Sequence, residues 1–154
     1  MKKRISIMIC ILSLITCSAI AQNIYPTKIE GCNTERFGLE NDSVSARKSN
    51  EALIKLITKN IDNDVLSDLR GVLKIQIIAY DDLTSCMISY ENATNKSIKE
   101  INITGIKKTI DNELIWDSVD KVVSPMIEIY FLIDTVTARR MGFSGNHGLH
   151  ELSN

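Results

Sequence analysis

Three stretches of the chain alternate hydrophobic and polar residues with the period of two that is typical of β-strands. They cover residues 72–80, 83–90 and 126–133. Asp81 and Asp82 separate the first two stretches, which suits a tight connection between antiparallel neighbours. The pattern therefore predicts a β-hairpin followed, later in the chain, by one further strand.

Two other stretches have the helical period. Residues 50–60 place Leu53, Leu56 and Ile57 at positions i, i+3 and i+4. Residues 95–114 repeat apolar residues at similar spacing, and all of them are isoleucines: Ile98, Ile101, Ile103, Ile106 and Ile110. Because β-branched residues have modest helix propensity, we expect packing against the hairpin to supply much of the second helix's stability.

Together these elements predict an α+β domain over residues 50–134. We expect a small three-stranded antiparallel sheet packed by two helices, in the order α-β-β-α-β. Residues 22–49 lack a sustained apolar period and are expected to form an extended N-terminal segment. Residues 135–154 are polar and rich in glycine, which favours a flexible C-terminal tail.

The first 21 residues have the pattern of a secretion signal. Lys2, Lys3 and Arg4 precede a short apolar run, and Ala19 and Ala21 form a small-x-small cleavage site. The apolar run is shorter than the roughly 20 residues that a membrane-spanning helix needs. We therefore expect residues 1–21 to be a signal peptide and the protein to be exported to the periplasm or cell envelope of a Gram-negative bacterium.

A different processing route remains open within the same segment. Leu14, Ile15, Thr16 and Cys17 resemble the bacterial lipobox, although threonine is unusual directly before the modified cysteine. Lipid attachment at Cys17, or an uncleaved signal, would place the protein on a membrane. Either route still exports the domain.

The charge balance argues against one class of partner. The chain has 18 basic and 19 acidic residues, and removing the signal would leave an excess of about four acidic residues. No segment carries a dense run of lysine and arginine. We expect no nucleic acid as a partner, because nucleic-acid-binding domains carry a basic patch or stripe.

Two cysteines, Cys32 and Cys86, would remain after cleavage. In an oxidising compartment they can form a disulfide, and two independent free thiols are an equally weighted alternative. A catalytic thiol would need a neighbouring base. The two histidines, His147 and His150, both lie in the expected tail.

The remaining polar groups indicate no enzyme. Asp81 and Asp82 suit a turn, the histidines lack further metal ligands, and no phosphate-binding loop or nucleophile elbow is present. Asp111 and Glu113 suit the end of a helix. We therefore predict no catalytic residue, no metal site and no small-molecule cofactor.

Residues 53–133 resemble the C-terminal domain of the TonB energy-transducer family. The similarity lies in the helix that ends near Asn60, in Gly71 before the first strand, in Trp116 after the second helix and in Pro125 before the last strand. The chain departs from the family in having no Tyr-Pro pair before the first strand. With a cleaved signal, we also expect it to lack the membrane helix and the Pro-rich spacer of true transducers.

The resemblance implies that the last strand is a sheet edge, to which a short segment of an outer-membrane transporter adds as a further strand. The edge would consist of Ile127, Glu128, Ile129, Tyr130, Phe131, Leu132 and Ile133. The plainer interpretation is that these residues only complete a sheet whose edge is covered by another segment.

We therefore expect an exported protein-interaction domain that binds a protein partner, such as an outer-membrane transporter or envelope complex, by strand addition. The alternative is a secreted or periplasmic inhibitor or immunity protein that blocks a toxin or an envelope hydrolase.

Overall fold

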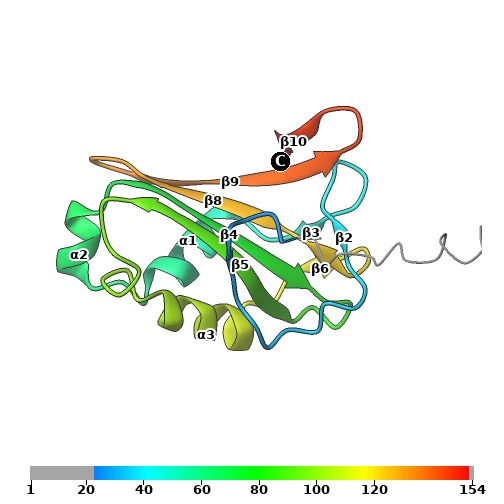
Figure 1. The fold of residues 1–154 in the computed structure, drawn as a ribbon, viewed down its shortest axis with the longest axis horizontal. Coiled ribbons are helices and arrows are strands. Elements are labelled where there is room, and N and C mark those ends of the chain that lie inside the picture. Colours follow the sequence, from blue (N-terminus) through cyan, green and yellow to red (C-terminus); the bar gives the residue numbers. More distant parts are fainter. Residues whose placement is uncertain (1–22, 153–154) are drawn as a thin grey trace, which may run out of the picture.

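A computed structural model describes residues 23–152 of the chain (Figure 1). The expected signal peptide and Cys17 lie outside these residues. The helices are α1 (Asn50–Thr58), α2 (Asn63–Asp68) and α3 (Ile103–Glu113). The strands are β1 (Thr27–Lys28), β2 (Gly38–Leu39), β3 (Ala46–Arg47), β4 (Gly71–Ala79), β5 (Ser85–Thr94), β6 (Ser118–Val119), β7 (Val123–Ser124), β8 (Met126–Phe131), β9 (Val136–Ser144) and β10 (Gly148–Glu151).

Eight strands form one sheet, and β3 and β6 form a second, two-stranded sheet. The main path of the large sheet is β1-β5-β4-β8-β9-β10, and all pairs along it are antiparallel. Strand β7 also pairs with β4, and β2 pairs in parallel with β7. The predicted three-stranded sheet is therefore wrong, because the described residues form a mainly antiparallel sheet of eight strands with three helices.

The extra strands come from the segments that lack a clear period in the sequence. Residues 135–154, expected to form a flexible tail, contain β9 and β10, so this prediction is also wrong. The pattern in β9 is hard to read because Arg140 and Gly142 occupy inward, buried positions. Strands β1, β2 and β3 have two residues each, which is too short to display a period.

Local capping explains where the helices begin. The Ser49 side chain accepts a hydrogen bond from the Ala52 amide at the start of α1. Helix α3 begins at Ile103, later than expected, because Asn102 adopts a left-handed conformation with φ of 53° and accepts from the Gly105 amide. An added Cβ at Gly105 would lie 2.4 Å from the Asn102 side chain, so a glycine is needed for this cap.

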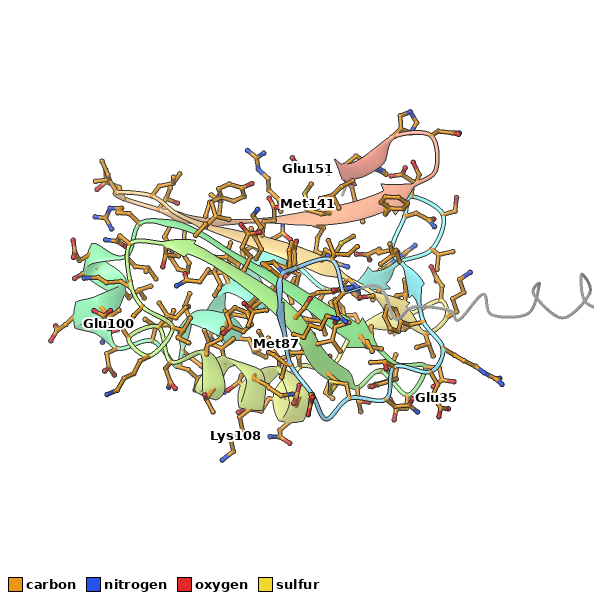
Figure 2. All side chains as sticks on the ribbon, in the orientation of Figure 1. Glu35, Met87, Glu100, Lys108, Met141 and Glu151 are labelled. Carbon is orange, nitrogen blue, oxygen red and sulfur yellow. A yellow bond between two sulfur atoms is a disulfide. The ribbon has the colours of Figure 1, made fainter. Side chains whose placement is uncertain are left out.

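The main core lies between the large sheet and the helices, with α1 and α3 on the same face (Figure 1). Met87, labelled in Figure 2, belongs to this core on the α3 side of β5. Residues at every second position of β4 and β8 are buried here: Leu73, Ile75, Ile77, Ile127, Ile129 and Phe131. The alternation that predicted these strands therefore also identifies the face they bury.

Residues 23–36, which we call the strap, run from the outer face of β4 to the edge of β5 (Figure 1). Its strand β1 pairs with Ser89 and Tyr90 of β5. The Ile24 amide donates to the side chain of Gln76, which lies on β4 between two inward positions. The strap therefore covers part of the face that the helices leave open.

Candidate binding surface

Strand β8 is not a sheet edge. It pairs with β4 on one side and with β9 on the other, so Ile129 lies between Leu73 and Ala138. The predicted edge strand is therefore wrong, because β9 supplies the neighbour that would have been a partner. The seven predicted residues fall into three groups: buried core (Ile127, Ile129, Phe131), the opposite face (Glu128, Tyr130) and the turn after β8 (Leu132, Ile133).

The β5 side of the sheet is protected against strand addition. Strand β1 pairs with its middle. Farther along, the Asp111 carboxylate accepts from the Met87 amide at 2.8 Å, and Lys107 donates to the Met87 carbonyl at 3.4 Å. These side chains of α3 occupy backbone groups that an added strand would need.

Strand β10 forms the other end of the sheet, and within residues 23–152 only β9 pairs with it. The Leu152 amide donates to the Arg140 carbonyl, and His150 lies opposite Gly142. Because backbone groups alternate in direction along a strand, those of Leu149 and Glu151 point away from β9. This outer edge of β10 is the open edge of the described sheet.

An apolar pair lies beside the open edge. Phe143 of β9 and Leu149 of β10 are directly opposite each other in the ladder, and their side chains are 42% and 44% exposed. Met141 lies two residues along β9 on the same face (Figure 2). Exposed apolar side chains next to unpaired backbone groups are what a strand-accepting site presents.

A row of charges of alternating sign crosses the same face. Lys74 lies 3.1 Å from Glu91, and Arg139 lies 3.4 Å from Glu151, which is labelled in Figure 2. Glu128 is paired in register with both Lys74 and Arg139. Because neighbouring charges of opposite sign compensate one another, this face has alternating local charges but no strong net charge.

Tyr130 is built into the charge row. Its hydroxyl donates to Glu128 at 2.5 Å, and this hydrogen bond raises the pKa of the Tyr130 phenol. The Arg139 guanidinium lies 5.0 Å from the centre of the Tyr130 ring, which allows a cation–π interaction. The two contacts hold the half-exposed ring in place.

A buried ion pair positions β9. Glu40, which follows β2, is fully buried, and the Arg140 guanidinium donates to both of its carboxylate oxygens and to the Ala46 carbonyl. The same guanidinium lies 5.0 Å from the centre of the Trp116 ring. Burial raises the pKa of the Glu40 carboxyl, and Arg140 opposes that rise. The pair joins the N-terminal segment to β9, on which β10 depends.

An open cavity of about 730 Å³ lies against this ion pair and against the first turn of α1. Its wall carries both signs of charge, and two of its carboxylates are paired: Asp117 with Lys48 at 2.7 Å and Asp42 with His150 at 3.2 Å.

The His150 contact predicts a pH dependence. Its ring contacts the Gly148 carbonyl at 3.0 Å and Asp42 at 3.2 Å, and these partners raise the pKa of His150 above 6.5. Because the folded-state pKa is the higher one, the contact stabilises the β10 hairpin fully below about pH 6.5, and this contribution disappears as pH rises through the folded pKa.

Proton NMR titration of the two histidine rings checks this expectation. The pKa of His150 should lie above 6.5 and should fall in Asp42→Asn, since the Asp42 contribution is removed. An unchanged pKa in the variant would show that Asp42 does not contact the ring in solution.

Cys32 and Cys86 form a disulfide, which decides between the alternatives left open by the sequence. The bridge joins the strap to β5 across a separation of 54 residues. Both cysteines are partly exposed. The two cysteines therefore form a cross-link, and this cross-link ties the strap to β5.

The other polar groups weighed from the sequence take part in local contacts. Asp82 accepts from the hydroxyl and amide of Thr84, which lowers the pKa of its carboxyl. Glu113 forms an ion pair with Lys59. Within residues 23–152 there is no group of three or more His, Cys, Asp and Glu side chains that could hold a metal ion.

Comparison with protein-family models, curated proteins and solved structures found no match for this chain. The similarity to the TonB C-terminal domain therefore stays a prediction from the sequence. Over the described part of the chain, no helix is long and apolar enough to cross a membrane.

Sequence reasoning missed the residues that make the open edge. Phe143, Leu149 and Glu151 lie in the segment interpreted as a tail. No period of two marks residues 148–152, because Leu149 and Leu152 lie three positions apart. The buried pair of Glu40 and Arg140 gave no local signal either, since the two residues lie a hundred positions apart in the chain.

Proposed function

We propose that this protein is an exported protein-interaction domain that accepts an extended segment of an envelope partner on the outer edge of β10. The observation that carries the proposal is the coincidence of that edge with the exposed pair of Phe143 and Leu149. An unpaired strand edge requires an extended polypeptide, because only such a backbone offers donors and acceptors at the strand period.

Two features support export. Residues 1–21 have the pattern of a signal peptide, and the Cys32–Cys86 bridge is typical of proteins that fold in an oxidising compartment. The resemblance to the TonB C-terminal domain suggests the kind of partner, an outer-membrane transporter with an extended segment. The proposed binding mode, strand addition, is the one that the resemblance implies, but the accepting strand is β10 and not β8.

The proposal predicts a contact that depends on backbone hydrogen bonding. A benzophenone side chain replaces Phe143 in the full chain, which is added to envelope fractions and irradiated. We expect one specific adduct with an envelope protein and none from the same probe at Lys108, an exposed residue of α3 (Figure 2).

Two variants at one position then test the strand-addition mode. Glu151→Pro removes an N–H that faces away from β9, so the fold should survive while the adduct falls at least about tenfold. Glu151→Ala keeps the N–H, loses the exposed ion pair with Arg139 and should retain the adduct. Equal yields from the two variants would contradict strand addition. A toxin or envelope hydrolase in the adduct would favour the inhibitor alternative.

A further inference from the structure

Few backbone hydrogen bonds hold the strap to the sheet. Strand β1 has two residues, and one more backbone bond runs from the Ile29 amide to the Ile88 carbonyl at 2.8 Å. The Tyr80 hydroxyl donates to the Asn33 carbonyl at 3.1 Å. Most residues between 26 and 36 are exposed. A strand this short is marginal in water without additional support.

The outer face of β4 and β5 buries polar and apolar side chains together, and the fully buried Gln76 accepts hydrogen bonds from the Ile24 amide of the strap and from Ser89. Ile78, Ile88 and Met126 are buried although none belongs to the main core between the sheet and the helices. Tyr25 of the strap is also buried, and it lies near Glu128. Undocking of the strap would break the hydrogen bond between Ile24 and Gln76 and uncover the edge of β5 at Ser89 and Tyr90.

The strap fits this surface imperfectly. The Tyr25 hydroxyl is buried and has no hydrogen-bond partner among the described residues. Burial and the nearby carboxylates raise the pKa of this phenol. Burial of a hydroxyl without a hydrogen-bond partner is unfavourable, which weakens the docking of the strap.

The disulfide compensates for this weakness. By joining Cys32 to Cys86 of β5, it shortens the connection between the strap and β5 and so raises the effective concentration for docking. Both sulfur-bearing residues are partly exposed, so a small or protein dithiol can reach the bridge.

We propose that the strap is an internal ligand, and that reduction of Cys32–Cys86 frees the β5 edge to bind an extended polypeptide. In the reaction, one thiolate of a dithiol reductant attacks a bridge sulfur to form a mixed disulfide. The second thiol of the reductant resolves it. The chain gains two thiols and the reductant becomes a disulfide.

The strap itself indicates what the site accepts. The occupant is an extended segment with an aromatic residue at the position of Tyr25, followed by residues that pair with Tyr90 and Ser89. Phenylalanine at this position has no hydroxyl to leave unpaired. A segment that supplies its own hydrogen-bond acceptor also avoids an unpaired hydroxyl. This site is separate from the outer edge of β10, so it does not rest on the proposed function.

Limited proteolysis tests the first step. Trypsin cuts after Lys28, which is exposed in β1, only when the strap leaves β5 and becomes flexible. We expect cleavage there to be at least about tenfold faster in the full chain carrying Cys32→Ser and Cys86→Ser than in the oxidised chain. Cleavage after Lys108 in α3 measures opening of the rest of the domain and should not change.

Two results overturn the proposal. Equal cleavage after Lys28 in both proteins would show that the strap stays docked without the bridge. Equal acceleration after Lys28 and Lys108 would show that the strap and the core unfold as one unit.

A peptide of residues 23–36 with serine at position 32 tests the second step. Added to the isotopically labelled double-serine chain, it should shift the amide signals of Ser89 and Tyr90, and it should not shift them in the oxidised chain. A peptide with Tyr25→Phe should bind at least as tightly, and one with Tyr25→Ala should bind at least about tenfold more weakly. The idea fails if the oxidised chain binds equally well, or if neither chain binds.

Discussion

Replacement of Arg140 by methionine is expected to lower the free energy of unfolding by about 3–5 kcal/mol. The substitution keeps much of the apolar volume but leaves the fully buried Glu40 carboxylate without its cation. An unpaired buried charge is far more costly than the ion pair is favourable, since neither water nor protein then compensates it. Urea unfolding at neutral pH measures the loss.

Two controls separate the buried charge from other effects. Arg139→Met changes the neighbouring residue, which is exposed and pairs with Glu151, and should cost less than about 1 kcal/mol. Adding Glu40→Gln to Arg140→Met should recover part of the loss because no charge remains buried. A loss below about 1 kcal/mol in Arg140→Met would mean that Glu40 reaches water in the folded protein.

Replacement of Ile75 by alanine is expected to destabilise the fold by about 2–5 kcal/mol. Ile75 is fully buried at the middle of β4, between Tyr90 of β5 and Ile127 of β8. Removing most of its side chain leaves a cavity in the closely packed core between sheet and helices. Thermal or urea unfolding of the purified variant measures the effect.

Lys74→Ala is the matched control for this prediction. Lys74 precedes Ile75 on the same strand but lies on the opposite face, where it pairs with the Glu91 carboxylate near the surface. We expect a cost below about 1 kcal/mol. Similar losses in the two variants would contradict the assignment of the faces of β4.

Hydrophobic periodicity predicted the strands and helices that bury one face over many residues. The stretches expected at 72–80 and 83–90 appear as β4 and β5, and the one expected at 126–133 appears as β8. The helix expected at 50–60 appears as α1. In each case, alternate or helically spaced apolar residues enter the same core, so local pattern and tertiary packing agree.

The width of the sheet could not be predicted in the same way. Strand β9 carries Arg140 and Gly142 at buried positions, where an alternation rule expects apolar residues. Arg140 is acceptable there only because Glu40, a hundred residues earlier, is buried beside it. A single sequence contains no local sign of such a long-range pair.

The candidate site followed from that error. With the last segment interpreted as a tail, the resemblance to the TonB C-terminal domain implies a binding edge at residues 127–133. Strands β9 and β10 move the edge outward by two strands. Strand addition remains a reasonable expectation, since it depends on unpaired backbone, but its location depends on which strand comes last.

The separation between Glu40 and Arg140 also sets an order of events during biosynthesis. A ribosome that adds about 5–20 residues per second needs about 5–20 s to go from one residue to the other. During that interval the carboxylate has no cation to accompany it into the interior, so the segment around it must remain hydrated. The bridge between Cys32 and Cys86 spans about half that distance. When the chain enters an oxidising compartment with its N-terminus first, both cysteines arrive before Arg140, so this half can be cross-linked before Glu40 has a place in the fold.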